Sequence, residues 1–161
     1  FQEVQSRGAI WAIKTISISE YRPPFLDKVE QWNKFKKNTG GTLVEKCCHY
    51  FDLMNLAAEA KPKKVYASGG QGVNFLDFEQ GGESADIDDH AFVVIDYDNG
   101  IRGNFTLNMF CHDFTEEMVI CGDRGRLPVG QDPTDVLTRF CLTEKGSTVL
   151  ADIEDRLERL A

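Results

Sequence analysis

One short stretch of the sequence carries residues whose types and spacing suit acid–base chemistry: Glu45, His49 and Asp52. On a helix these positions are i, i+4 and i+7, and at about 100° per residue they fall within a sector of roughly 60°. One face then carries two carboxylates and an imidazole. This arrangement suits a histidine that acts as acid or base while a carboxylate fixes its tautomer and stabilises its charged form.

Each of these residues also has a simpler interpretation. Glu45 follows Thr42 by three positions and can complete a capping box at the start of the helix. Asp52 can pair with a nearby lysine, and a single histidine on a mostly apolar helix is often a packed core residue. Spacing alone leaves both interpretations open.

Other polar clusters give weaker signals. Cys47, Cys48 and His49 are consecutive, so their side chains diverge by about 100° and do not close around one ion, and Cys111-His112-Asp113 has the same defect. We therefore predict no metal site. Gly69-Gly70-Gln71-Gly72 lacks the strand–glycine loop–helix context of a dinucleotide site, so a plain turn is expected and no cofactor-binding residues are assigned in this chain. The cluster at residues 86–90 is interpreted as the polar entry to a strand.

The elements that must position the acid–base residues follow from the apolar pattern. Residues 43–60 predict one helix that is apolar most of the way round and therefore buried, and Pro62 marks its end. Before it, residues 8–20 predict a long strand with a bulge between Ile13 and Ile16, and residues 25–41 are irregular or partly helical. After it, the pattern has period two, and the predicted elements are strands at 65–68, 92–95, 101–109 and 118–121, a turn at 98–100, a last hairpin within 137–150 and a helix at 153–160.

Two strands of this pattern are specific enough to place in a sheet. Phe92-Val93-Val94-Ile95 is apolar on both faces, as in a covered central strand. The strand 101–109 alternates, with Ile101, Phe105, Leu107 and Met109 on one face and Arg102, Asn104, Thr106 and Asn108 on the other. One long strand, a helix and then a meander of strands indicate an α+β fold.

Composition limits the partners. The 161 residues have the size of one domain, and a formal net charge of -8 gives no general attraction for a phosphate backbone, so no nucleic acid is expected. No apolar run approaches the roughly 18 residues of a membrane span, so no membrane partner is expected. Five cysteines, an odd number, favour reduced thiols and a cytoplasmic location. The first residues, Phe1-Gln2-Glu3-Val4, fall inside an ordered pattern, which indicates a domain of a longer parent.

Several motifs in order resemble one family. They are Arg22-Pro23-Pro24-Phe25, Trp32-Asn33, the run from Thr39-Gly40-Gly41 through Glu45-Lys46-Cys47-Cys48-His49 to Asp52-Leu53-Met54, Pro62-Lys63-Lys64-Val65, Asp89-His90-Ala91 and Gly122-Asp123-Arg124-Gly125. Together they resemble the glucose–fructose oxidoreductase / inositol dehydrogenase (Gfo/Idh/MocA) family over about residues 8–127. Proteins of that family join an N-terminal Rossmann domain, which binds NAD(P) and carries a catalytic lysine, to a C-terminal domain.

The resemblance implies that residues 1–161 are a single C-terminal domain for substrate binding and oligomerisation. Its fold would be a large, mostly antiparallel, open-faced sheet with helices packed on one side. It also implies that His49 is the catalytic acid–base residue and that Glu45, Lys46 and Asp52 bind a sugar or polyol. The family commonly has aspartate where Glu45 stands, and Lys46 either extends into the pocket or pairs with Asp52.

The resemblance further implies a partner Rossmann domain, a homodimer or higher homo-oligomer formed through the open sheet, and a parent oxidoreductase that acts on CH–OH groups. NAD or NADP would be bound by the parent. Because this chain has neither the Glu-Lys-Pro motif nor a GxGxxG fingerprint, we expect it to bind no nicotinamide and to be inactive alone. The alternative is a free-standing, non-catalytic dimerisation or ligand-binding module of the same fold.

Overall fold

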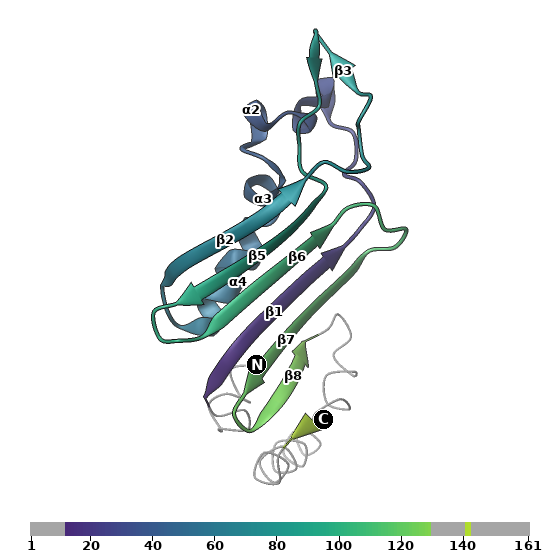
Figure 1. Cartoon of the computed structure of the whole chain (residues 1–161). Coiled ribbons are helices and arrows are strands. Elements are labelled where there is room, and N and C mark those ends of the chain that lie inside the picture. The colour runs from purple at the N-terminus through teal and green to yellow at the C-terminus, as the bar shows by residue number, and fades with distance from the viewer. Residues whose placement is uncertain (1–11, 130–140, 143–161) are drawn as a thin grey trace.

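The computed structural model describes residues 12–129 and 141–142. Its main element is a seven-stranded sheet with the strand order β2, β5, β6, β1, β7, β8, β9 (Figure 1). The strands are β1 (Ile13–Tyr21), β2 (Pro62–Gly70), β5 (His90–Tyr97), β6 (Arg102–Asn108), β7 (Thr115–Gly122), β8 (Gly125–Val129) and β9 (Cys141–Leu142). A separate ribbon pairs β3 (Glu79–Gln80) with β4 (Glu83–Ser84). The predicted helix at 153–160 and most of the predicted hairpin at 137–150 lie outside the described residues.

The described sheet is mostly antiparallel, as predicted. Its one parallel pair is β1 with β6, because β1 is inserted between β6 and β7. The register of β1 against β7 shifts between Ile13 and Thr15, which confirms the predicted bulge. The predicted turn at 98–100 is also confirmed: Gly100 has φ of 89°, and the Tyr97 N–H donates to the Ile101 carbonyl at 2.9 Å.

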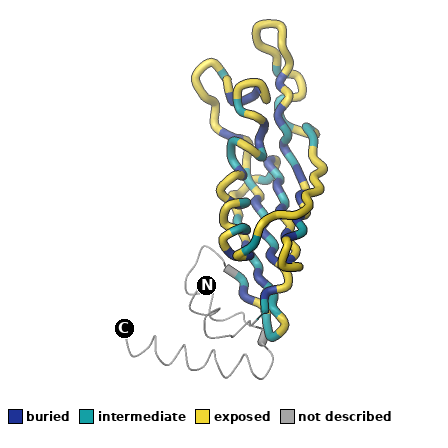
Figure 2. The backbone as a smooth tube through the Cα atoms, turned by 90° about the vertical axis from the view of Figure 1, so that its left-hand side faces the viewer, coloured by how far each residue is buried: buried dark blue, intermediate teal, exposed yellow. Residues whose placement is uncertain are grey.

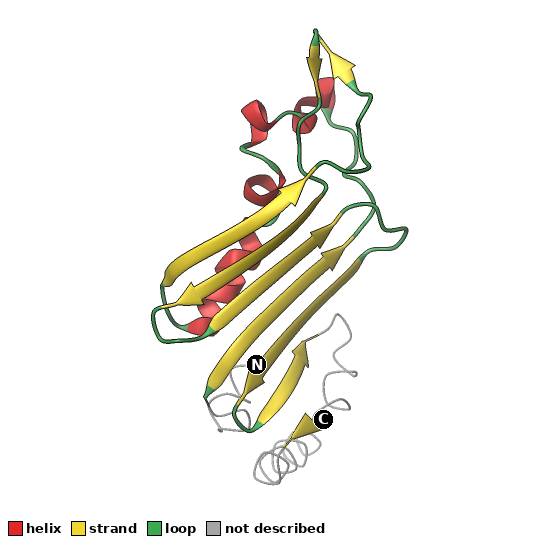
Figure 3. Ribbon diagram, in the orientation of Figure 1, coloured by secondary structure: helices red, strands yellow, loops and turns green. Residues whose placement is uncertain are grey.

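One face of the sheet is crossed by the long helix α4 (Cys48–Ala58), and the shorter helices lie toward the end at which β1 and β6 finish (Figure 3). The shorter helices are η1 (Val29–Lys34), α2 (Lys36–Thr39) and α3 (Thr42–Glu45). The core lies between α4 and the middle strands, where Ile16, Phe105 and Ile120 are fully buried. Gly103 allows the close approach, since a Cβ there would stand 2.4 Å from the Met54 Cε. Seen from the side, the buried residues gather along the middle of the molecule (Figure 2).

The opposite face of the sheet is open. On β6 the alternation is as predicted, with Phe105 and Leu107 buried beneath the helix and Arg102 and Asn104 exposed. The prediction that the strand around residues 92–95 is covered on both faces is wrong. Phe92 is 59% exposed and Val94 44% exposed. Both lie on the open face. The strand β5 does lie between β2 and β6, but its apolar run marks an exposed apolar surface and not a strand covered on both faces.

The predicted single helix over residues 43–60 is interrupted. It divides into α3 and α4 at Lys46 and Cys47, and Cys47 has φ of −100° and ψ of −2°, in the bridge region. The Cys47 carbonyl accepts from the N–H groups of both Tyr50 and Phe51, so a new helix starts there. Because no Gly or Pro lies between residues 42 and 60, the sequence carries no local signal for this break.

The predicted capping box is also wrong. Gly41, and not Thr42, is the N-cap of α3, and no side chain caps it. The Thr42 hydroxyl is buried and donates instead to the Asp88 carbonyl at 2.6 Å. This bond ties the start of α3 to the segment that enters β5, and it leaves Glu45 free for another contact.

Candidate functional site

The four residues predicted to form a site lie around the junction of α3 and α4. Glu45 ends α3, Lys46 stands in the junction, and His49 and Asp52 occupy the first turns of α4. The Lys46 Nζ lies 2.8 Å from the Glu45 Oε1, and both side chains are largely withdrawn from solvent. Lys46 therefore pairs with Glu45 in this structure, and the alternative pairing with Asp52 is not observed.

His49 is exposed and packs its ring against Tyr50, with 4.0 Å between ring centroids. His49 and Asp52 are three positions apart on α4, so they share a face of that helix. Within residues 12–129, no hydrogen bond or ion pair joins His49 to Glu45 or to Asp52. The break before α4 thus separates Glu45 from the helical face on which the sequence placed all three residues.

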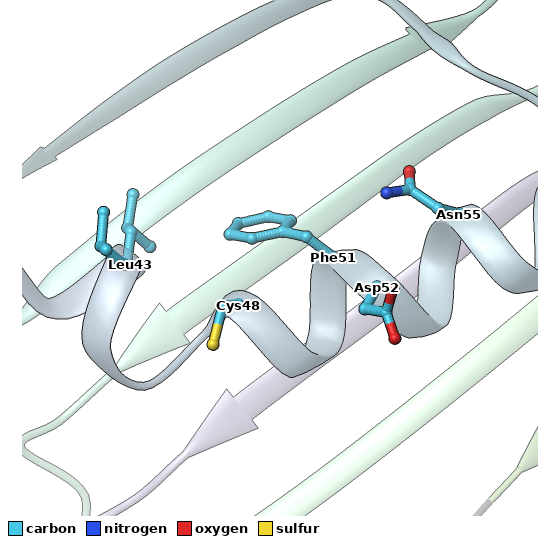
Figure 4. Close-up of a pocket in the computed structure, with 6 residues that line it drawn as sticks. Leu43, Cys48, Phe51, Asp52 and Asn55 are labelled. Atoms are coloured by element: carbon cyan, nitrogen blue, oxygen red, sulfur yellow. The ribbon is translucent and has the colours of Figure 1, made fainter.

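Asp52 borders a shallow hollow of about 420 Å³ along α3 and α4. The lining residues are Leu43, Val44, Cys48, Phe51, Asp52 and Asn55. Figure 4 shows Leu43, Phe51 and Asn55 projecting from one side of the helical ribbon and Cys48 and Asp52 from the other. Asp52 is the only charged residue among the six, so a ligand in the hollow would meet apolar walls and one carboxylate.

Sequence reasoning missed a polar cluster beneath the junction. The Tyr50 hydroxyl donates to the Glu116 carboxylate on β7, and Glu116 lies directly opposite Glu20 of β1 in the sheet register. Burial and then the hydrogen bond to Glu116 raise the pKa of Tyr50, so it stays a neutral phenol. One signal was available: Glu20 continues the inward alternation of Ile16 and Ile18, which places a carboxylate in a core position.

Glu20 is 2% exposed and forms an ion pair with Arg22 at 2.8 Å. The Arg22 guanidinium lies over the ring of Phe25, with its Cζ 4.3 Å from the ring centroid. The Lys46 Nζ is 5.2 Å from the same centroid. Phe25 therefore connects the ion pair at the end of β1 with the ion pair at the end of α3.

Cys47 is buried beside this cluster and is not suited to nucleophilic chemistry. Burial, with a further contribution from the charge of Glu20, raises the pKa of its thiol to about 12. A thiol with such a pKa stays protonated at neutral pH.

A second polar centre lies at the entry to β5, where the sequence predicted only a polar lead-in. The buried Asp89 carboxylate accepts hydrogen bonds from the backbone N–H groups of Gly72, Val73 and Asn74 at 2.7–3.0 Å. It also lies 2.8 Å from the His90 Nδ1. Burial tends to raise the pKa of Asp89, but these hydrogen bonds together lower it below its ordinary value. The loop after β2 is thus fixed by Asp89.

The described part of the chain contains no group of three or more His, Cys, Asp or Glu side chains arranged to hold a metal ion. No helix in it is long and apolar enough to cross a membrane.

Comparisons with known proteins give the family. A family described as "Oxidoreductase family, C-terminal alpha/beta domain" (Gfo/Idh/MocA) matches residues 6–155. No curated protein sequence matches the chain.

Solved structures share the fold. A Thermotoga maritima protein described as an oxidoreductase superposes with a TM-score of 0.66 at 18% identity, over 81% of this chain and 38% of its own. A Sinorhizobium meliloti 1021 protein described as a myo-inositol dehydrogenase gives 0.64 at 18% identity, over 80% and 36%. Levoglucosan dehydrogenase in complex with NADH and levoglucosan gives 0.63 at 18% identity, over 78% and 34%.

The chain therefore spans 34–38% of the length of these structures. At this level of identity they show the fold alone. Because the family match covers nearly the whole sequence, the chain belongs to the Gfo/Idh/MocA oxidoreductase family and has the fold of its C-terminal α/β domain.

Proposed function

We propose that this chain is the substrate-binding and dimerising half of an NAD(P)-dependent oxidoreductase that acts on a sugar, inositol or related polyol. The family match over residues 6–155 carries the proposal. The solved relatives support the substrate class, since one is described as a myo-inositol dehydrogenase and another holds levoglucosan and NADH. The chain covers only about a third of their length, so activity is proposed for a longer protein.

The described residues do not fit a dinucleotide. The glycine-rich stretch 69–72 ends β2 instead of leading into a helix, and the N–H groups of Gly72 and Val73 already donate to Asp89. A pyrophosphate needs such N–H groups free at a helix N-terminus. We therefore assign NAD or NADP to a Rossmann domain elsewhere in the parent, and we expect the chain alone to bind neither and to be inactive.

Within this proposal the residues of the junction bind and orient the substrate. Glu45 and Lys46 together offer acceptors and donors to neighbouring hydroxyl groups, and Asp52 offers a further acceptor on α4. His49 is exposed beside them, so its imidazole can take the proton from a substrate hydroxyl. The nicotinamide, when present, supplies the hydride acceptor.

Replacement of His49 tests this role in the parent protein. Loss of a general base typically lowers kcat by about 10²–10⁴-fold, so His49→Ala should do this with nearly unchanged cofactor affinity. His112→Ala is the matched control, because His112 is also exposed but lies after β6 and not on α3 or α4. A His49→Ala protein that turns over at the parent rate would contradict the proposal.

The open face of the sheet supports self-association. Tyr66, Phe92 and Val94 lie on it, exposed to 69%, 59% and 44%, beside the polar side chains of β6. An apolar patch with a polar surround suits an interface between copies related by a two-fold axis. Sedimentation over a concentration series should show a dimer that Phe92→Asp dissociates. A monomer at tens of micromolar would exclude self-association through this face.

The free thiols of Cys47, Cys48, Cys111 and Cys121 fit a cytoplasmic location.

A non-catalytic module remains the second candidate. One observation favours it: among the described residues, His49 has no carboxylate within hydrogen-bonding distance. The coding sequence upstream of Phe1 separates the two candidates. A Rossmann domain directly before Phe1 supports the enzyme, and a start codon there supports the module.

A further inference from the structure

The backbone of Arg22 is fixed at the end of β1. Its N–H donates to the Asn108 carbonyl at 2.9 Å, and its own carbonyl accepts from the Cys111 N–H at 3.1 Å. Both backbone groups are thus held by the segment that leaves β6. The side chain starts from a position that the sheet itself determines.

The guanidinium of Arg22 is oriented on three sides. Its Nη1 donates to the Glu20 Oε1 at 2.8 Å, and its Nε donates to the Pro23 carbonyl at 3.3 Å. Its flat face lies over Phe25, and its Cζ is 5.6 Å from the ring centroid of Phe114. Guanidinium carries five N–H donors, and the Nη2 group has no partner among the described residues. With 26% of the side chain exposed, this pre-oriented side chain is partly accessible to a ligand.

A purely structural ion pair would not need this geometry. Burial of a carboxylate is costly, and a buried ion pair adds little net stability even when its geometry is good. Glu20 is nevertheless buried, and its Oε2 has no hydrogen-bond partner in the described structure. The placement of Glu20 is explained if its function is to hold Arg22 in one orientation.

Arg22 is also connected to the candidate site. Phe25 contacts both Arg22 and Lys46, and Lys46 is paired with Glu45. Glu20 stands opposite Glu116, which holds Tyr50, the neighbour of His49. Arg22 thus adjoins the same junction from the sheet side.

The charges of this region indicate which ligand it accepts. Glu20, Glu45 and Glu116 supply three carboxylates, whereas Arg22 and Lys46 supply two cations, each already paired with a carboxylate. A phosphate or a carboxylate would add negative charge to a region that has no free cation among these groups. A neutral hydroxyl can accept from the Arg22 Nη2 without that cost.

We infer that Arg22 is a substrate-binding residue that donates from Nη2 to a hydroxyl oxygen of a neutral polyol, and that Glu20 is the positioning residue that orients it. The inference rests on the proposed function and deepens it, because it names the group that selects a neutral substrate over an anionic one.

The test is an NMR titration of this chain with myo-inositol, with glucuronate and glucose 6-phosphate as anionic probes. Myo-inositol should shift the Arg22 Nε–Hε signal together with the amide signals of the junction. Arg22→Lys, which keeps the charge but loses the planar fork, should weaken myo-inositol binding about 10-fold or more. Arg102→Lys is the matched control, since Arg102 is paired with Asp96 at 3.0 Å on the open face.

Glu20→Gln provides a readout that a structural role alone would not change. The glutamine side-chain oxygen can still accept from Arg22, but one negative charge is removed. The ratio of the glucuronate Kd to the myo-inositol Kd should therefore decrease. Melting curves accompany each variant. Should Arg22→Lys fail to fold, the Arg22 Nε–Hε shift in the unmodified chain decides the question alone.

The outcomes separate this inference from the proposed function. If myo-inositol shifts the junction but binds Arg22→Lys equally well, the role of Arg22 is excluded and the proposed function stands. Tighter binding of glucuronate than of myo-inositol excludes the neutral-ligand assignment. If Arg22 responds as expected but the parent oxidises no polyol, the proposed function fails and the binding role stands. Absence of any shift at 100 mM myo-inositol overturns the inference.

Discussion

The middle of the sheet and the end at which β1 and β6 finish are built from the same strands in opposite ways. In the middle, Ile16, Phe105 and Ile120 are fully buried under α4 and carry no polar atoms in their side chains. At the end, which we call the polar end (Glu20, Arg22, Asp89 and Glu116), two fully buried side chains are carboxylates. Both regions exclude water, but only the polar end has buried charge to neutralise.

The two regions separate the contacts that hold the fold from those that prepare a site. Apolar burial in the middle stabilises without direction, roughly in proportion to the area removed from water. Buried carboxylates at the polar end are stable only through specific donors, namely Arg22 for Glu20 and three backbone N–H groups for Asp89. Such directional contacts fix loops and side chains in place. Substitutions in the two regions should therefore differ in kind.

The largest effect is expected in the middle of the sheet. Phe105→Ala removes a ring that stacks on Tyr50 and meets Phe51 edge-on, with centroids 5.2 and 5.3 Å away. The lost burial and the remaining cavity should lower the free energy of unfolding by about 3–5 kcal/mol. Urea unfolding measures it, with Phe110→Ala as control, because Phe110 is 42% exposed and lies outside the patch of Tyr66, Phe92 and Val94. Comparable losses for the two variants would show that the helix-covered face is not the core.

At the polar end, the effect of one substitution should depend on the other. Arg22→Met leaves Glu20 buried without its cation and should lower the free energy of unfolding by about 2–3 kcal/mol. In the double variant Glu20→Met/Arg22→Met, most of that loss should be recovered, because no buried charge remains. A double-mutant cycle from urea unfolding gives the coupling. Additive losses would indicate that the two residues contribute only packing.

The sequence predicts the middle of the sheet far better than the polar end. Alternation places Phe105 and Leu107 inward on β6, and the turn at Gly100 is predicted by Asp98-Asn99-Gly100, since these signals are local. The break at Cys47 is not predicted, because no glycine or proline marks it in the sequence. The roles of Arg22 and Asp89 depend on contacts between residues that are distant in the sequence. Arg22 is held by Asn108, 86 positions later, and Asp89 accepts from residues 72–74, 15–17 positions earlier. No local sequence pattern encodes such contacts.

The candidate site is predicted in its residue types but not in its arrangement. Helical spacing places Glu45 with His49 and Asp52, whereas the structure pairs Glu45 with Lys46 and leaves His49 against Tyr50. The prediction assumed an unbroken helix, but the structure ends one helix at Glu45 and starts another at Cys48. The roles of these four residues stay predictions.

The smallest effect is expected at Asp89, and its pH dependence makes it specific. Asp89→Asn keeps the shape but loses the charged acceptor of the N–H groups of Gly72, Val73 and Asn74, so the free energy of unfolding at pH 7 should fall by about 1 kcal/mol. The pKa of Asp89 is lowered in the folded protein, so its contribution is complete above the pKa of the unfolded chain, about pH 4, and disappears as the pH falls through the folded value. The difference in free energy of unfolding between wild type and variant should therefore be constant from pH 7 to about pH 5 and shrink below about pH 4.

Urea unfolding at pH 7, 5 and 3 measures this difference. Hydrogen exchange at residues 72–74 should be faster in the variant than in the wild type at pH 7. Asp88→Asn is the control, since Asp88 makes a half-exposed ion pair with Lys36 at 3.1 Å and should change stability by less than about 0.5 kcal/mol. A difference that grows toward pH 3 would mean that Asp89 is not the anionic anchor of the loop.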